Sequence, residues 1–376
     1  MGPTVNYVDF AVEGVQALRP YEPGKPVEEL QRELGLNDVI KLASNENPLG
    51  ASPRVVEALR DQAPDLASYP DGSGYRLKRK LAERHRIGAD RITLGNGSND
   101  VLDLVARVFL GPGRAAVFSE YAFAVYPLVT RAVCAEARVA PARARDDAMP
   151  LGHDLDAFAQ RIDADTRVVF IANPNNPTGT WLAPDDIDAF LRAVPAEVVV
   201  VLDEAYRDYL EPGERVESRA LLERHPNLVL TYTFSKIFGL AGLRVGYALA
   251  NAQVTDLLNR VRQPFNVNSA ALRAAELALD DRDHLERSLA VNREGLTTLG
   301  QALDHRGLER LPSQGNFVTF SVAGDAQPVF QSLLRQGVIV RPLGGYGLAQ
   351  WLRVTVGTPE QNARFVEALD RSLDGV

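Results

Sequence analysis

Short apolar runs alternate with helix-like stretches through the middle of the chain, and this alternation is the feature that most constrains the fold. Runs such as 168–171 and 198–202 are apolar at every position. Strands of this kind are buried on both faces, which is typical of a parallel sheet covered by helices. The sequence therefore predicts an α/β fold with a mostly parallel central sheet in a large domain. Strands are expected at 91–94, 115–118, 133–140, 168–171, 198–202, 228–231 and 245–250, with helices at 75–86, 99–109 and 121–131.

The two ends of the chain have different patterns. Residues 1–50 carry many prolines and glycines, and we expect them to form an arm and part of a small domain. The large domain is expected over 51–264. A helical pattern from Ser269 to about Arg306 suits a long connector, and 265–376 is expected to hold this connector and a small C-terminal α/β domain. Its strands are predicted at 316–322, 338–341 and 352–356, and its helices at 328–335 and 359–373.

Composition excludes several classes of partner. The 41 basic and 49 acidic residues give a net charge of −8 without a basic block, which disfavours nucleic acid. Cys134 is the only cysteine, so no disulfide can form within the chain. The five histidines lack metal-ligand spacing and are expected to be solvated. Residues 1–10 do not resemble an export signal and the apolar runs are too short to span a membrane, so we expect a cytoplasmic protein.

A lysine ends one of the apolar runs. The stretch 230–239 is rich in β-formers up to Ser235-Lys236, and Arg244 follows eight residues later behind two glycines. Burial disfavours the charged form of a lysine and lowers its pKa, which makes the amine a nucleophile for aldehydes. A Ser-Lys pair alone does not decide the matter, because most lysines lie on solvated surfaces.

Three other motifs accompany Lys236. An apolar strand ends at Asp203, with Tyr206 three residues later, and another runs into a turn that contains Asn176. Near the C-terminus, Arg353 lies in an alternating strand pattern. A helix-capping acid and a core tyrosine are the ordinary alternatives for Asp203 and Tyr206. In this order and at these distances the motifs resemble the aspartate-aminotransferase superfamily of pyridoxal-phosphate (PLP) enzymes, fold type I.

This resemblance implies a role for each motif at the cofactor. Lys236 would bind the PLP aldehyde and carry a proton during catalysis, and Asp203 would pair with the ring nitrogen. Tyr206 and Asn176 would bond to the ring hydroxyl. Arg353 matches the arginine that binds the substrate carboxylate, and its planar fork suits a phosphate equally well.

The phosphate of the cofactor is expected where a strand meets a helix N-terminus, in the segment 95–100. The resemblance assigns donors in two parts of the chain, namely Gly97, Ser98, Asn99, Ser235 and Arg244. It also assigns the ring that stacks on the cofactor to Tyr121. The usual proline two positions earlier is Ser119 here, and Phe123 is a second aromatic residue nearby.

Segments 18–24, 42–50, 68–71 and 338–343 narrow the resemblance to the histidinol-phosphate aminotransferase family. The implied reaction converts L-histidinol phosphate and 2-oxoglutarate to imidazole-acetol phosphate and L-glutamate. Arg341, Tyr21 and Asn47 would join Arg353 in binding the substrate. Tyr69 would reach the PLP phosphate of the neighbouring subunit, which implies a homodimer with shared active sites.

Two alternatives share this frame. An aromatic or dual-specificity aminotransferase would use the same motifs, since the imidazole and phenyl rings of the substrates are both flat and similar in shape. A threonine-phosphate decarboxylase would cleave the bond from the α-carbon to the carboxylate instead. A protein that only binds PLP is disfavoured because Lys236 and Asp203 are both present. A dehydrogenase is disfavoured because the glycine-rich fingerprint is incomplete, with Asp100 at the third glycine position.

Overall fold

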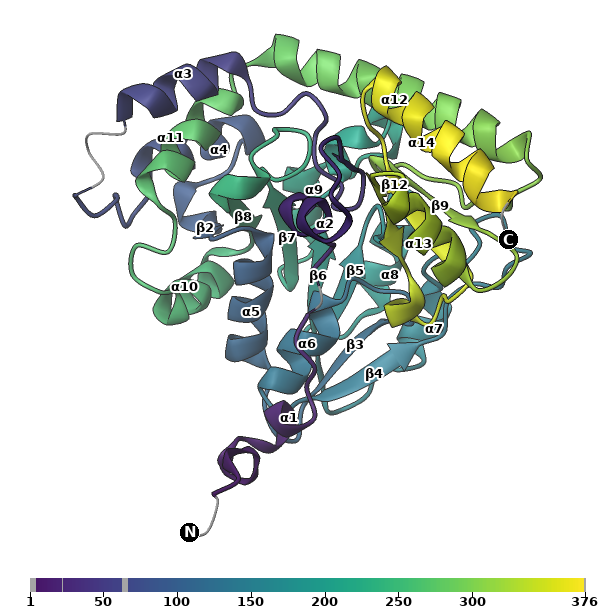
Figure 1. Ribbon diagram of the computed structural model, residues 1–376. Coiled ribbons are helices and arrows are strands. Elements are labelled where there is room, and N and C mark those ends of the chain that lie inside the picture. Colours follow the sequence, from purple (N-terminus) through teal and green to yellow (C-terminus); the bar gives the residue numbers. More distant parts are fainter. Residues whose placement is uncertain (1–4, 22, 63–66, 375–376) are drawn as a thin grey trace.

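The computed structural model describes residues 5–21, 23–62 and 67–374, and its centre is a seven-stranded sheet (Figure 1). β8 is the one strand of this sheet that runs opposite to the other six, which confirms the predicted mostly parallel sheet. The strand order is β2 (Ile92–Gly95), β8 (Gly246–Leu249), β7 (Leu228–Thr233), β6 (Val199–Asp203), β5 (Thr166–Ala172), β3 (Ala115–Ser119) and β4 (Glu136–Ala140).

Both faces of this sheet are covered, as the continuously apolar strands require. In β6, Val200 and Leu202 belong to one buried core, while Val199 and Val201 belong to the other. The first core is completed by α3 (Pro53–Gln62), α4 (Tyr75–His85), α7 (Leu155–Ala159), α8 (Pro184–Ala193), α9 (Ser218–Arg224) and α11 (Ser269–Ala278). The second is completed by α5 (Ser98–Phe109), α6 (Val125–Ala132) and α10 (Ala252–Val261).

A smaller sheet lies beside the large one. It has the order β11 (Arg341–Pro342), β12 (Trp351–Thr355) and β9 (Phe317–Ser321), and all its pairs are antiparallel. Residues from both ends of the chain meet here, because β1 (Ile40–Lys41) pairs in parallel with β10 (Val338–Ile339). The covering helices are α2 (Val27–Leu34), α12 (Arg282–Asp304), α13 (Ala326–Arg335) and α14 (Pro359–Leu373).

The predicted helix from Ser269 to about Arg306 is wrong in one respect, because it is broken in two. The first helix, α11, ends at Ala278, and α12 begins at Arg282. Asp281 is the N-cap of α12, and its carboxylate accepts a hydrogen bond from the His284 backbone N–H at 3.1 Å. An acidic residue is favourable at a helix N-terminus and unfavourable at a C-terminus, so it starts a new helix instead of continuing the old one.

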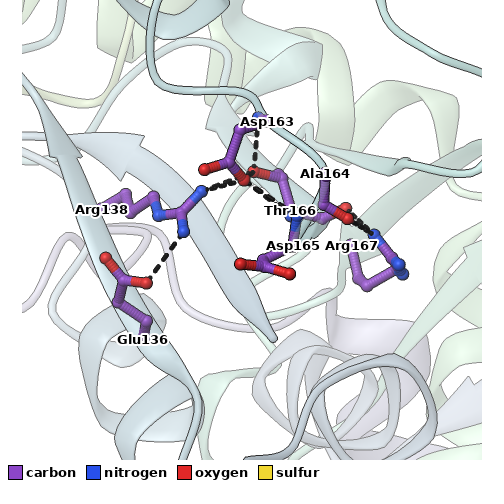
Figure 2. A network of polar contacts seen from close by, with 7 residues as sticks. All are labelled: Glu136, Arg138, Asp163, Ala164, Asp165, Thr166 and Arg167. Atoms are coloured by element: carbon purple, nitrogen blue, oxygen red, sulfur yellow. Dashed lines mark hydrogen bonds and ion pairs between the residues drawn. The ribbon is translucent and has the colours of Figure 1, made fainter. Parts of the chain in front are cut away.

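The edge strand β4 is protected by charged side chains (Figure 2). Arg138 pairs with Glu136 at 2.9 Å and with Asp163, which lies in the turn before β5. Its guanidinium also donates to Thr166 Oγ1 at 3.2 Å. Charges on an edge strand oppose pairing with a strand from another molecule. This network therefore ties β4 to Asp163 in the turn before β5 and to Thr166 in β5.

The histidines differ from the expectation that they are solvated. His153, His225 and His284 are buried. His153 Nε2 lies 3.0 Å from the Ala172 carbonyl oxygen, and burial lowers the pKa of His153 to about 4. These side chains are therefore part of the packed interior. In the described ranges no helix is both long and apolar enough to cross a membrane.

The first described residues project from the body of the molecule (Figure 1). A short helix, α1 (Glu13–Gln16), packs on α6, and the Gly14 backbone N–H donates to Cys134 Sγ at 3.3 Å. Before it, the aromatic side chains of Tyr7 and Phe10 are exposed. Neither side chain therefore takes part in either core.

Candidate active site

A cavity of about 210 Å³ lies beyond the carboxyl ends of β5, β6 and β7. In α/β sheets this is the edge where ligands bind. The cavity collects side chains that are far apart in the sequence. Its lining residues include Ser44, Ser98, Asn99, Phe123, Asn176, Asp203, Tyr206, Ser235, Lys236 and Arg244. Most of the residues that the sequence assigned to the cofactor are therefore brought together.

Lys236 lies three residues after the end of β7, and its side chain is half-buried at the cavity. Its Nζ donates to the Ser44 carbonyl oxygen at 3.2 Å and lies 5.5 Å from the centre of the Tyr206 ring. Burial, with a smaller contribution from the Arg353 charge, lowers the pKa of Lys236 to about 8. With this pKa, about a tenth of the amine is unprotonated at pH 7 and can attack an aldehyde.

Asp203 ends β6 and its side chain is buried at the same cavity. One carboxylate oxygen accepts a hydrogen bond from Tyr126 OH at 3.0 Å, and the other accepts one from Thr231 Oγ1 at 3.0 Å. Burial raises the pKa of Asp203, and the two hydroxyl donors oppose this rise. An oriented carboxylate of this kind can pair with a ligand nitrogen that carries a proton.

Tyr206 is held by a residue that the sequence analysis missed. Asn45 Nδ2 donates to Tyr206 OH at 2.8 Å, so the tyrosine oxygen has an accepting bond and keeps its own hydrogen for another partner. Asn45 Oδ1 in turn accepts from Thr355 Oγ1 at 3.1 Å. Asn45 adopts φ +56°, a left-handed conformation that asparagine tolerates better than most residues.

Arg353 lies in β12 and is buried, although it carries a full charge. Its Nη2 donates to the Ala43 carbonyl oxygen at 2.7 Å, and its Nη1 donates to Asn176 Oδ1. Its Nε is buried, and no partner for it exists among the described residues. Burial lowers the pKa of Arg353, which means that the surroundings disfavour its charge unless an anion compensates.

Two predicted substrate-binding residues lie next to Arg353. Arg341 is its cross-strand partner in the antiparallel pair of β11 and β12. The Arg341 guanidinium lies 5.7 Å from the centre of the Tyr21 ring, a cation–π arrangement. Arg341, Arg353 and Tyr21 thus lie near one another, and Arg341 and Tyr21 line a second cavity that neighbours α2 and α13. Tyr346, which the sequence analysis did not single out, lies in the turn that joins the two strands.

A glycine-lined cradle lies where β2 meets α5. Gly97 has φ +82°, and a Cβ at this position would collide with the guanidinium of Arg244. That guanidinium donates to Ser235 Oγ at 3.3 Å and to the Ala241 carbonyl oxygen at 3.1 Å. The first backbone amides of α5, from Ser98 onward, have no partner within the helix. Free amides beside a guanidinium form an anion site.

These groups fit pyridoxal phosphate. The amine of Lys236 suits its aldehyde and the carboxylate of Asp203 suits its ring nitrogen. The cradle suits its phosphate, because backbone amides, a hydroxyl and an arginine converge there. Within the described ranges, no three acidic, histidine or cysteine side chains form a metal-binding group.

The cradle makes a specific prediction about Gly97. Gly97→Ala is expected to weaken PLP binding about tenfold or more, because the new Cβ displaces Arg244 and the left-handed backbone is strained by any side chain. Gly111→Ala is the control, since a Cβ there meets nothing within 4 Å. Fluorescence titration of both apoproteins with PLP measures the effect, and equal affinities would contradict this account of the cradle.

Of the two aromatic residues before α6, Phe123 lines the cavity and Tyr121 does not. The Tyr121 side chain packs instead on a separate apolar cluster that includes Leu343 and Trp351. Phe123, and not the expected Tyr121, is therefore the residue placed to contact a ligand in the cavity. Phe123 and Tyr126 share a T-shaped contact with 5.9 Å between the ring centres.

Asn47 and Tyr69 lie outside this cavity. The Asn47 amide donates to the Ile237 carbonyl oxygen at 2.8 Å and to Ser288 Oγ at 2.9 Å. These bonds fix the backbone just after Lys236, so Asn47 stabilises the site without lining the cavity. Tyr69 is 82 % exposed and stacks on Phe265 at 4.7 Å.

Comparison with known proteins identifies the family. The model of the family "Aminotransferase class I and II" matches residues 37–369. The chain belongs to this family. Histidinol-phosphate aminotransferase 2 of Pseudomonas aeruginosa is 57 % identical to this aminotransferase. The match covers 98 % of this chain and 99 % of the relative. Histidinol-phosphate aminotransferase 1 of Dechloromonas aromatica is 54 % identical over 98 % of this chain and 100 % of the relative.

Solved structures agree with this assignment. The histidinol-phosphate aminotransferase of Sinorhizobium meliloti, crystallised in complex with pyridoxal-5'-phosphate, superposes with a TM-score of 0.88. It is 25 % identical to this aminotransferase, and the match covers 97 % of each chain. The predicted fold, a PLP-dependent transferase of fold type I, is thereby confirmed.

Proposed function

We propose that this aminotransferase uses PLP to transfer the amino group of L-histidinol phosphate to 2-oxoglutarate, giving imidazole-acetol phosphate and L-glutamate, a step of histidine biosynthesis. Two lines of support converge. Relatives that share more than half of their residues with it over nearly full length are named histidinol-phosphate aminotransferases. The residues at the cavity, moreover, supply each group that PLP requires.

The observation that carries the substrate assignment is the pair Arg341 and Arg353. They are directly opposite each other in β11 and β12, where two like charges destabilise a sheet. The Arg341 charge is one reason why the pKa of Arg353 is lowered. A phosphate carries up to two negative charges and bonds to guanidinium groups in a bidentate manner, so it would relieve this repulsion. The same pair would accept the carboxylates of glutamate in the other half-reaction.

The residues of the site would hold the cofactor in a defined way. Ser98, Asn99, Ser235 and Arg244 would bind its phosphate, with Gly97 allowing the close approach. Asp203 would pair with the ring nitrogen, and Tyr206 and Asn176 would donate to the ring hydroxyl. Phe123 would cover one face of the ring. When bound, PLP supplies an electron sink that stabilises negative charge developing at the substrate α-carbon.

Lys236 would perform the proton transfers. With its pKa lowered to about 8, the amine can accept a proton from the substrate α-carbon and return it without a large energetic cost at neutral pH. Arg353 and Arg341 would fix the distal anion so that the α-carbon lies near this amine. Lys236 and Asp203 belong to the proposed large domain (51–264) and the two arginines to the proposed small domain (265–376), so the substrate would lie between them.

The proposal includes a cytoplasmic homodimer with shared active sites. Tyr69 is far too exposed for a residue with only a packing role, and its stacking partner Phe265 is 44 % exposed. Tyr75 is a third exposed aromatic side chain that follows in the same region of the chain. A second subunit would cover these rings, and Tyr69 would then reach the PLP phosphate of that subunit.

The test measures glutamate formation by PLP-loaded protein with 2-oxoglutarate and L-histidinol phosphate. L-Histidinol, phenylalanine and threonine phosphate serve as competing donors. We expect kcat/KM for histidinol phosphate to exceed that for histidinol by about a hundredfold or more, because histidinol lacks the anion. Arg341→Gln is expected to remove most of this preference, whereas Arg371→Gln, on the exposed side of α14, keeps it.

Other outcomes identify the alternatives. Faster turnover of phenylalanine would make this an aromatic or dual-specificity aminotransferase. Release of carbon dioxide from threonine phosphate without glutamate would make it a decarboxylase. Either result would overturn the assignment of histidinol phosphate as the principal substrate.

A further inference from the structure

Tyr126 is a fully buried tyrosine on α6. It does not line the cavity, but it contacts Asp203, which does. Its ring stacks on Phe170 with 4.9 Å between the centres and 9° between the planes, and Phe123 packs against it edge to face. The ring therefore has little freedom to move. Its hydroxyl is aimed at one group, the Asp203 carboxylate, to which it donates a hydrogen bond at 3.0 Å.

The Asp203 carboxylate is fixed by two hydroxyls of different elements. Tyr126 bonds to Oδ2 and Thr231, from the neighbouring strand β7, bonds to Oδ1. Each oxygen has further lone pairs, so both bonds leave room for a third partner. The titratable groups that surround the carboxylate are Tyr126 on α6, Tyr206 after β6 and Lys236 after β7, with Glu204 adjacent in the chain.

Burial acts against the function that Asp203 is proposed to have. It raises the pKa of the carboxyl group, whereas an ion pair with a protonated ring nitrogen requires the ionised form. Hydrogen bonds donated by hydroxyls stabilise that ionised form. Burial also holds the pKa of Tyr126 well above its usual value, so this hydroxyl remains a donor.

We propose that Tyr126 is a positioning residue that, together with Thr231, keeps the Asp203 carboxylate ionised and oriented toward the cofactor ring nitrogen. This inference rests on the proposed function, since it requires PLP at the cavity. It goes beyond that function because it assigns part of the cofactor's electronic control to a side chain that does not line the cavity.

A second pair of a buried tyrosine and a buried carboxylate, Tyr232 and Glu204, serves as the control. Glu204, the residue after Asp203, also has a buried carboxylate that accepts from a buried tyrosine, with Tyr232 OH at 2.5 Å from Oε2. Tyr232 further bonds to Ser218 and stacks on Tyr247. Glu204 and Tyr232 line a small separate cavity beside Arg207 instead of the cofactor cavity. Both tyrosines can be changed to phenylalanine with the ring retained.

The experiment compares Tyr126→Phe and Tyr232→Phe with the wild type. Apoproteins are titrated with PLP, and the visible absorption of the bound cofactor is followed as a function of pH. We expect Tyr126→Phe to weaken PLP binding about tenfold or more, as for loss of a hydrogen bond to a charged group. We also expect its absorption to titrate at a shifted pH. With saturating PLP, kcat should fall while KM changes little.

The control and a second variant complete the test. Tyr232→Phe should alter the melting temperature but neither PLP affinity nor the absorption titration. Thr231→Val, which removes the other donor in nearly the same shape, should act in the same direction as Tyr126→Phe, and it supplies the test if Tyr126→Phe fails to fold.

Two results would overturn the inference. One is a Tyr126→Phe protein with the PLP affinity and absorption titration of the wild type. The other is an equal effect of Tyr232→Phe, which would mean that buried tyrosine hydroxyls act through general packing. A wild-type protein that does not bind PLP would instead overturn the proposed function, and this inference with it.

Discussion

Lys236→Ala is expected to lower transamination by about a thousandfold or more, since the same amine binds the cofactor aldehyde and moves the proton. The change removes the hydrogen bond from Lys236 Nζ to the Ser44 carbonyl oxygen. The Asn47 bonds to the Ile237 carbonyl oxygen and to Ser288 do not involve the lysine side chain, so the fold should survive. Lys80→Ala is the control, because Lys80 pairs with Asp280 away from the cavity. Steady-state rates with saturating PLP measure the difference, and a loss below about tenfold would refute this role for Lys236.

The pH dependence of the reaction between the apoprotein and PLP provides a second test of Lys236. Because burial lowers the pKa of Lys236 to about 8, the neutral amine becomes dominant as the pH rises through that value. The initial rate at which the apoprotein reacts with the PLP aldehyde should therefore rise up to about pH 8 and then level off. A rate that keeps rising toward pH 10.5, the usual pKa of a lysine side chain, would mean that the amine is not desolvated.

The second large effect is expected for Asp203→Asn, which should lower kcat by about a hundredfold to a thousandfold. The amide has nearly the shape of the carboxylate but no charge to pair with a protonated ring nitrogen. It also presents an N–H₂ group to Tyr126 or Thr231, whose hydroxyls are arranged as donors. A kcat close to that of the wild type would show that the ion pair is dispensable.

Glu204→Gln is the control for this change. Glu204 is buried beside Asp203 in the chain, and burial raises the pKa of Glu204 to about 7, yet its carboxylate belongs to the small cavity near Arg207. We expect this variant to alter the melting temperature and to keep most of the activity. Measuring both properties for both variants separates loss of charge at the cofactor from loss of a buried polar group.

The sequence predicted the sheet and most of the site because both follow from local patterns. Apolar runs that end in Asp203 or just before Lys236 are visible without tertiary information, and the parallel arrangement brings their ends to one edge of the sheet. Gly97 is likewise recognisable, since a glycine between a strand and a helix suggests an anion cradle. The family resemblance then supplied Arg353 and Arg341, which lie in a different sheet.

The residues that sequence analysis missed act through tertiary contacts. Asn45 reaches Tyr206 across a separation of 161 positions, and Tyr126 reaches Asp203 across 77. No local pattern distinguishes either from an ordinary core residue. The sequence also could not tell which of Tyr121 and Phe123 lines the cavity, because that depends on how the chain turns before α6 begins at Val125.

One feature of the fold bears on how this enzyme is made in the cell. The segment 42–47 lies between the two sheets, where the Ala43 carbonyl oxygen accepts from Arg353 and the Asn45 backbone N–H donates to Thr355 Oγ1 at 2.9 Å. Both partners are in β12, 310 positions further along the chain in each case. During synthesis, which proceeds from the N-terminus, the segment 42–47 must therefore wait until β12 has been made. Nascent chains that stop before β12 should leave the ribosome without a finished cofactor pocket, so stable cofactor retention would report synthesis through β12.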